Sequence, residues 1–336
     1  MSAALALPTA QERRRAAFQR INKSTIVMLV VTVVVFVAFA VASPAFLTVH
    51  NLQNVAVQVA PTAIVAVAMT FVITTGMIDL SVGSTLALVS VIGAQLLKGG
   101  MQSTLVIVIC LAVGAFCGVV NGWFASYQKM PSFIVTLATM SVIRGVALLL
   151  TLGYSVAISP TLIFARIGQG SFLGFGYPAW IALVVVVLGL LALQRMRFGQ
   201  YVTGVGSNEE SVRRAGVNTN AIKLMALTLS GLAAAVAGII TAGRLGSGDA
   251  NSGSDFALSV ITAVVIGGTN MLGGKGSILG TAVGAILTGV ITDGLTLLGL
   301  SPYIVPIVTG GLLIVVILIN LRGGNLADFM RKRVLR

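Results

Sequence analysis

Charge is scarce in this sequence. Only 9% of the 336 residues are Asp, Glu, Lys or Arg, and only 8 of them are acidic, whereas 57% of the chain is hydrophobic. The longest stretches without apolar runs, residues 1–25 and 195–223, are too short to bury a core of their own. We therefore exclude a separate soluble domain.

Cysteine and histidine are also rare. The two cysteines, Cys110 and Cys117, share one helical face, a spacing that suits small packing residues and matches neither a zinc site nor a disulfide framework. His50 is the single histidine. The apolar runs hold no Ser/His, Cys/His, paired-Asp or metal-ligand cluster, so we expect no catalytic residue and no metal site.

Long apolar runs dominate the chain. The mean hydropathy is +1.04, and about 20 apolar residues cross a bilayer as a helix, so the sequence predicts an all-α, polytopic transmembrane bundle. We expect about ten spans, at residues 26–42, 55–75, 81–97, 104–126, 133–152, 179–194, 223–243, 256–271, 277–298 and 303–321. Together they form one transmembrane domain, residues 26–321. The spans around 70–97 and 256–298 are short and rich in glycine, so each pair either crosses the membrane or re-enters it.

Basic residues gather at three places in the chain. They lie in the N-terminal segment 1–25, in the stretch 195–223 and in the C-terminal tail 322–336. The positive-inside rule places all three in the cytoplasm, and two cytoplasmic termini require an even number of spans. The first span is too long for a signal-peptide core, so we expect an uncleaved anchor.

Residues 195–223 form a polar island, with seven of the 29 charged residues (21 basic and 8 acidic). Ser207 and Glu210 fit a capping box, which predicts a helix from about Asn208 to Ala215. Gly216 suits the left-handed residue that closes it. Two i,i+4 ion pairs, Glu209 with Arg213 and Glu210 with Arg214, would support this helix.

A helix this short is marginal in water unless something packs on it. We therefore hypothesise that the flanking membrane helices hold it and that it docks into another protein. The alternative is a solvated loop whose capping pattern arose by chance.

The stretch Gly76 to Ser84, GMIDLSVGS, sets an acid and two glycines between apolar segments. A carboxylate at the bilayer centre is costly, so Asp79 must face protein, a wet cavity or the interface. A broken helix here would offer backbone dipoles and the hydroxyls of Ser81 and Ser84 to a polar substrate. The alternative is a cytoplasmic turn in which Asp79 or Ser81 caps the next helix.

Two further charges fall inside predicted spans. Asp293 lies in the ninth span and Arg144 in the fifth, and pairing them would lower the cost of both. For Asp293 a structural role and a place in the substrate pathway remain equally open.

Glycine recurs every fourth position in two places. Such stripes let neighbouring helix backbones approach closely, so we interpret them as packing faces that hold the bundle or a dimer. They consist of Gly114, Gly118 and Gly122, and of Gly276, Gly280 and Gly284.

The second stripe begins in GGTNMLGGKGS, residues 267–277, which is not a Walker A loop. Gly276 stands where the hydroxyl residue belongs and Thr269 where the leading glycine belongs. The chain therefore offers no site for hydrolysing ATP, and a partner must bind any nucleotide that drives it. Aligning Gly83-Ser84 with Gly276-Ser277 suggests, weakly, an internal repeat.

Three blocks in this order resemble the membrane permeases of bacterial sugar ABC importers, the ribose, xylose and galactoside branch. They are residues 76–94, 206–223 and 257–287, and the likeness covers nearly everything from about residue 25 to 321. Met77 departs from the glycine expected there in many relatives.

The resemblance implies a multi-pass protein of the bacterial inner membrane that pairs with a second permease copy. It also implies a cytoplasmic ATPase that binds ATP and Mg²⁺, and a periplasmic protein that delivers a pentose, hexose or similar solute. The implied ATPase contacts are Asn208, Glu209, Glu210, Arg213, Arg214 and Gly216. The implied pathway residues are Ile78, Asp79, Leu80 and Ser81. Nucleic acid has no place in this interpretation.

The alternative function is a secondary transporter that couples uptake to protons or sodium through Asp79 and Asp293. It accounts poorly for the polar island. A membrane scaffold or intramembrane enzyme is a third possibility, which the lack of a catalytic cluster disfavours.

Overall fold

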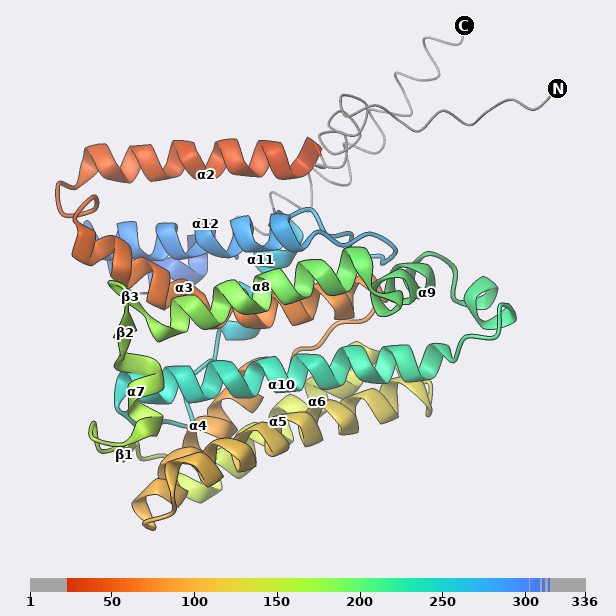
Figure 1. Ribbon diagram of the computed structural model, residues 1–336, viewed down its shortest axis with the longest axis horizontal. Helices are drawn as coiled ribbons and strands as arrows, with labels where there is room; N and C mark the ends of the chain where they lie inside the picture. The colour runs from red at the N-terminus through yellow and green to blue at the C-terminus, as the bar shows by residue number, and fades with distance from the viewer. Residues whose placement is uncertain (1–22, 302, 309, 312–313, 315–336) are drawn as a thin grey trace, which may run out of the picture.

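The computed structural model describes residues 23–301, 303–308, 310–311 and 314, and consists mainly of long helices lying side by side (Figure 1). The helices are α2 (Lys23–Ala42), α3 (Val49–Thr74), α4 (Val82–Lys98), α5 (Ser103–Ser126), α6 (Ser132–Thr151), α7 (Ile163–Gln169), α8 (Tyr177–Arg195), α9 (Arg197–Arg214), α10 (Thr219–Leu245), α11 (Phe256–Ile266) and α12 (Ile278–Leu297). The basic tail 322–336, residues 1–22 and much of the predicted span 303–321 lie outside the described residues.

Four two-residue strands complete the described structure. Strand β1 (Val156–Ala157) pairs antiparallel with β4 (Ser247–Gly248), and β2 (Ser171–Phe172) pairs with β3 (Phe175–Gly176). The first pair joins two connections that are far apart in the chain, the one after α6 and the one after α10.

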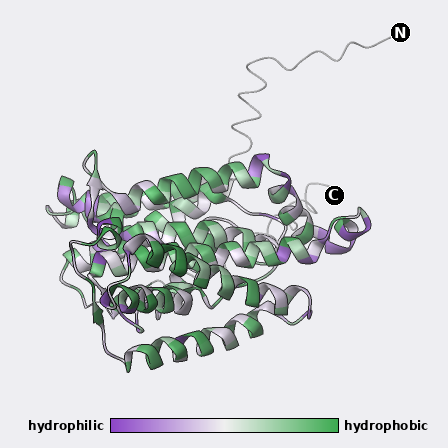
Figure 2. Ribbon diagram, turned by 60° about the horizontal axis from the view of Figure 1, so that its bottom comes forward, coloured by the Kyte–Doolittle hydropathy of each residue, from purple (hydrophilic) through white to green (hydrophobic). Residues whose placement is uncertain are grey.

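Six described helices are long and apolar enough to cross a membrane: α3, α5, α6, α8, α10 and α12. The apolar part of α2, α4 and α11 are shorter. Hydrophobic residues run along the helices, and hydrophilic residues gather at their ends and in the connections (Figure 2). The prediction of an all-α polytopic membrane protein is confirmed, whereas the count of ten spans and the side of the termini remain predictions. The start of α2 and the polar helix α9 lie at the same end of the bundle (Figure 1).

Helices α3 and α10 form the centre of the bundle. In their membrane-crossing windows, 78% and 61% of residues are buried, against 22% in α6 and 17% in α8. The apolar outer faces of α6 and α8 therefore meet lipid or another protein rather than this chain's own core.

Helix α5 packs on α10 through its glycine stripe. A Cβ on Gly118 would lie 2.5 Å from the carbonyl oxygen of Leu227, and one on Gly114 would lie 2.5 Å from that of Gly231. At Gly122 the nearest neighbour is Leu224. The stripe thus brings two backbones together within one chain, where any larger side chain would force them apart.

The second stripe lines the start of α12. A Cβ on Gly280 would overlap the carbonyl oxygen of Gly267, and one on Gly284 would overlap that of Ala263. Gly276, before the helix, lies against the side chain of Thr74. These glycines seat α12 against α11 and the end of α3.

Two interruptions of the helical bundle meet in its interior. After α3 the chain turns at Gly76 (φ 82°), and α4 begins only at Val82. After α10 it turns at Gly246 (φ 67°), and α11 begins only at Phe256. Because α11 has 11 residues and α4 has 17, both are shorter than a spanning helix of about 20.

Glycine allows these two interruptions to touch. A Cβ on Gly253, which precedes α11, would lie 2.8 Å from the carbonyl oxygen of the buried Gly83 in α4. The breaks therefore touch at the buried Gly83, whereas Gly76 and Asn251 are exposed. Irregular backbone at membrane depth is tolerated where it is buried in protein or lines a cavity.

The two interruptions also resemble each other. Both read Gly-x-x-Asp, at Gly76–Asp79 and at Gly246–Asp249, and each carboxylate accepts the N–H of the residue two positions on, at 2.9 Å from Ser81 and 2.8 Å from Asn251. Helices α3 and α10 run in opposite directions (Figure 1). The structural likeness therefore pairs the α3–α4 break with the α10–α11 break. The alignment of Gly83-Ser84 with Gly276-Ser277 instead pairs the start of α4 with the start of α12.

Candidate functional site

The segment Ile78–Ser81 is held rigidly before α4. Asp79 is only 1% exposed, and its Oδ1 accepts hydrogen bonds from the Ser81 N–H at 2.9 Å and from the Ser81 hydroxyl at 2.7 Å. Asp79 thus faces protein, as the cost of a charge in lipid requires. Ser81 makes no capping bond with its own side chain, because its hydroxyl serves Asp79 instead.

Side chains of α5 and α6 extend this network. Asn121 donates to the Ser81 hydroxyl at 2.8 Å and accepts from the Thr139 hydroxyl at 2.7 Å. The Ile78 N–H donates to Ser132 Oγ at 3.1 Å, and the Ile78 carbonyl accepts from Thr136. Helices α5 and α6 therefore contribute polar contacts to a place that would otherwise leave backbone groups unpaired.

Several buried polar atoms nearby lack a hydrogen bond within the described part of the chain. They are Asp79 Oδ2 and the hydroxyls of Ser84, Thr85 and Ser230. Ser230, from α10, lies beside Asp79 without the geometry of a hydrogen bond. Buried groups of this kind need water or a polar ligand to satisfy them.

The polar helix α9 bends at Asn208, whose φ of −160° and ψ of 94° are extended. The Asn208 side chain accepts the N–H of Ser211 at 3.0 Å and so caps the second half of α9. The predicted cap, Ser207, was wrong by one residue, because its hydroxyl donates back to the Thr203 carbonyl in the preceding turn. Gly216 closes the helix with φ 83°, as predicted.

The ion pairs differ from the predicted set in one place. Glu210 pairs with Arg214 at 3.0 Å, as predicted, and also with Arg213. The predicted pair of Glu209 with Arg213 was wrong, because Glu209 turns inward to Lys223 at 2.5 Å and accepts from Thr219 at 3.0 Å.

These contacts lower the pKa of both acids. For Glu209, burial alone would raise the pKa, but the hydrogen bond and charge of Lys223, helped by Thr219, more than offset it. For Glu210, hydrogen bonds from Arg213 and then Arg214 lower the pKa. The two carboxylates are therefore ionised near neutral pH.

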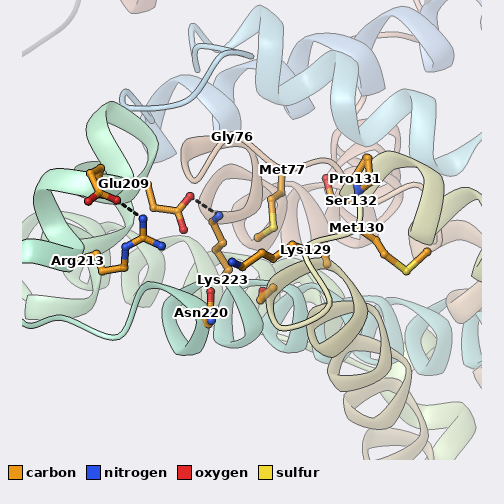
Figure 3. A pocket seen from close by; sticks show the side chains of 13 residues that line it. Gly76, Met77, Lys129, Met130, Pro131, Ser132, Glu209, Arg213, Asn220 and Lys223 are labelled. Carbon is orange, nitrogen blue, oxygen red and sulfur yellow. Dashed lines mark hydrogen bonds and ion pairs between the residues drawn. The ribbon is translucent and has the colours of Figure 1, made fainter.

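A cavity of about 500 Å³ opens beside this helix (Figure 3). Figure 3 shows the Glu209 and Lys223 side chains meeting at its wall, with Met77 and Lys129 close by. Its lining residues are Gly76, Met77, Ala125, Ser126, Lys129, Met130, Pro131, Ser132, Glu209, Glu210, Arg213, Asn220 and Lys223. The cavity thus brings helix α9, with the predicted ATPase contacts, next to Gly76 and Met77, whereas none of the predicted pathway residues Ile78–Ser81 lines it.

The first half of α9 also touches the glycine loop before α12. A Cβ on Gly206 would lie 2.5 Å from the Gly274 nitrogen, and Gly274 itself donates to the Thr74 carbonyl at 2.9 Å. A Cβ on Gly273 would lie 3.0 Å from the nitrogen of Gly76. The polar island therefore packs against the end of α3 and against Gly273 and Gly274 of the 267–277 loop. A movement of α9 at Gly206 would displace both.

The predicted pairing of Arg144 with Asp293 was wrong. Arg144 donates instead to the carbonyls of Ala250 and Ser252, the latter at 3.1 Å, and so ties α6 to the second interruption. Asp293 accepts from the Asn51 side chain at 2.8 Å and joins α12 to α3. Asp293 therefore makes a helix-to-helix contact, and its place in a substrate pathway remains a prediction.

Sequence reasoning missed several residues of this site. Asn121 could have been predicted from the sequence, because it is the single amide side chain in an apolar helix and such a side chain needs a hydrogen-bond partner. The contacts of Thr219 and Lys223 with Glu209 could not be predicted from local spacing, because the partners are 10 and 14 residues apart. Among the described residues no three His, Cys, Asp or Glu side chains come together to hold a metal.

A family of transport proteins, described as branched-chain amino acid transport system permease components, matches residues 51–317. The chain belongs to this permease family. It is 38% identical to the ribose import permease RbsC of Escherichia coli over 302 residues, which covers 89% of this chain and 93% of that protein. No solved structure gives a significant match.

Other relatives carry sugar names as well. The chain is 36% identical to the L-arabinose ABC transporter permease AraH of Azospirillum brasilense, over 91% of this chain and 90% of that protein. It is 29% identical to the xylose transport permease XylH of Haemophilus influenzae, over 89% of this chain and 96% of that protein.

Proposed function

We propose that this permease is the membrane subunit of a bacterial ATP-driven importer for a pentose, hexose or similar small polar solute. The family description mentions branched-chain amino acids, but the similar full-length relatives are named for ribose, L-arabinose and xylose. Uncharged sugars require hydroxyl, amide and backbone partners, and those are the groups that surround the segment Ile78–Ser81. The protein lies in the inner membrane and crosses it several times.

This proposal depends on helix α9 (Arg197–Arg214), which we call the coupling helix. Its second half uses Glu209 to grip α10, while Glu210, Arg213 and Arg214 stay exposed, Arg214 at 79%. One face is thus fixed to the bundle and the other is free for a cytoplasmic ATPase. That partner binds ATP and Mg²⁺ and, by moving α9, shifts Gly206 against α3 and the 267–277 loop.

Two further partners complete the importer. A periplasmic binding protein delivers the sugar to the opposite end of the bundle, near β1 and β4. A second permease copy, identical or related, covers part of the apolar outer surface, to which α6 and α8 contribute.

Co-purification and cross-linking test the partner assignment. A cysteine at Ser211 in the coupling helix should cross-link to the co-expressed ATPase, whereas one at Lys98, at the end of α4, should not. A permease that purifies without any ATPase, and that cross-links to none through residue 211, would refute the assignment.

A further inference from the structure

A second, smaller cavity lies within the membrane-crossing part of the bundle. It has a volume of about 210 Å³ and is walled by α3, α11, α12 and the segment that follows α12. Its lining residues are Gln58, Val59, Thr62, Ser259, Ala285, Thr288, Gly289, Thr292 and Val305. Five of these nine carry a hydroxyl or an amide, and none carries a charge, which is unusual for the interior of a membrane bundle.

The polar side chains come from three helices and line a common cavity. Gln58 and Thr62 are four positions apart on α3, and Thr288 and Thr292 are four positions apart on α12, so each pair occupies one helical face. Ser259 is contributed by the first turns of α11. The close approach of Val59 to Gly289, where a Cβ would overlap the valine, brings α3 and α12 together within the cavity wall.

These side chains can form further hydrogen bonds beyond those in the structure. Thr288, Thr292 and Ser259 donate to carbonyls of their own helices, at 2.9, 2.9 and 3.2 Å, so their oxygens still have lone pairs to accept with. Gln58 and Thr62 have no hydrogen bond to any described residue. Polar groups that only hold membrane helices together would bond across the helix contacts, and none of these five side chains does so to a residue that the structure describes.

The cavity's size selects the ligand. At about 30 Å³ per water it holds roughly seven waters, and it falls below the range of about 300–1,000 Å³ typical for drug-sized ligands. A single sugar ring fits this volume, whereas an oligosaccharide does not. The lining offers acceptors for sugar hydroxyl protons and, through Gln58 and Thr62, donors for their oxygens.

We infer that this cavity is a sugar-binding subsite on the translocation route, with Gln58, Thr62 and Thr292 as its principal contacts. The inference rests on the proposed importer function and adds the place where the solute is held within the membrane. The subsite lies beside the first turns of α11, which contribute Ser259 to its wall.

Cysteine labelling tests whether the cavity is wet and holds sugar. The native Cys110 and Cys117 are buried, so we expect little labelling of the protein without an introduced cysteine. In the assembled transporter a small water-soluble thiol reagent should label Thr62→Cys, and ribose, arabinose or xylose, whichever the transporter moves, should slow labelling at least about fivefold. Val184→Cys, on the exposed face of α8, should stay unlabelled. An unreactive Thr62→Cys, or labelling that no transported sugar slows, would overturn the inference.

Transport rates provide the second test. Thr292→Val and Gln58→Leu should each lower the maximal uptake rate about five- to tenfold, the cost of one lost hydrogen bond, while ATP hydrolysis continues. Thr228→Val is the matched control, since the Thr228 hydroxyl makes the same bond to its own helix at 2.9 Å outside the cavity. Unchanged uptake in both cavity variants would refute the subsite. A wild-type transporter that moves no sugar would instead refute the importer function itself.

Discussion

Glu209 and Lys223 form an ion pair at 2.5 Å that joins the coupling helix to the first turns of α10. The Lys223 side chain is only 18% exposed, so this pair is better shielded than those of Glu210. It also forms part of the wall of the 500 Å³ cavity beside α9, next to Gly76 and Met77. In the proposed importer, this pair would transmit a movement of α9 to α10.

We predict that Glu209→Gln will reduce sugar uptake per ATP hydrolysed at least about threefold, because the coupling helix loses its charged link to α10. Lys223→Gln, which removes the other partner of the same pair, should lower this ratio to a similar extent. The measurement is uptake and ATP hydrolysis in the same vesicles. The exchange Glu209→Lys with Lys223→Glu should restore part of the ratio, and an unchanged ratio in both single variants would contradict the prediction.

The same ion pair gives a pH dependence. The pKa of Glu209 in the folded protein lies below its ordinary value of 4.5, so the stabilisation is present above that value and is lost as the pH falls through the lowered pKa. For a partly exposed pair it amounts to about 0.5–1 kcal/mol. The difference in melting temperature between the wild type and Glu209→Gln should therefore be visible at pH 7 and vanish in acid. A difference that grows toward acid would have the wrong sign.

Replacing Gly118 by alanine should destabilise the bundle by about 1–3 kcal/mol, because the new methyl group would lie 2.5 Å from the Leu227 carbonyl oxygen. Gly145→Ala, in α6, is the matched control, since nothing lies within 4 Å of its Cβ position. Thermal unfolding of the detergent-solubilised protein measures both. Equal melting temperatures would show that α5 and α10 do not pack as described.

Arg144→Met should loosen the interruption before α11, because two charge-assisted bonds to backbone carbonyls are lost. Such bonds contribute about 1.5–3 kcal/mol each, so amide hydrogen exchange across residues 246–255 should accelerate about tenfold or more. Arg166→Met, on α7, provides a control for removing a positive charge. Unaltered exchange in Arg144→Met would rule out its holding role.

Asp79→Asn separates the two candidate uses of this buried acid. Asparagine keeps an oxygen that accepts from the Ser81 N–H and hydroxyl, so ATP-driven uptake should persist, whereas Asp79→Ala should lose most of it. Ion-coupled transport through Asp79 would require the charge and would fail in Asp79→Asn. Uptake assays of the two variants, with expression levels compared by immunoblot, decide between these outcomes.

The sequence predicted the helices well because long apolar runs and flanking charges act locally. It also located the break at Gly76–Ser84 and the polar helix before Gly216. It did not identify the capping residue of that helix, because Ser207 and Asn208 are both good caps. They differ only in the structure, where the Ser207 hydroxyl donates to the Thr203 carbonyl and Asn208 is left to cap. The partners of Glu209 and Arg144 lay beyond its reach, because a side chain 14 residues away and two backbone carbonyls leave no local pattern.

The cavity between α3 and α12 was equally beyond the sequence. Thr288 and Thr292 follow the common pattern for threonine in an apolar helix, in which the hydroxyl bonds to a carbonyl of the preceding turn. Only the close approach of Val59 and Gly289 brings the two polar faces together. Sites of this kind depend on how helices are rotated about their axes, which composition does not specify.

The importer function is best tested by sugar accumulation in sealed vesicles that contain the permease, its ATPase and the binding protein. We expect ATP to drive accumulation of at least one pentose or hexose, and the permease alone to accumulate none under a proton or sodium gradient. Gradient-driven accumulation by the permease alone, or none with ATP in the complete system, would contradict the importer function.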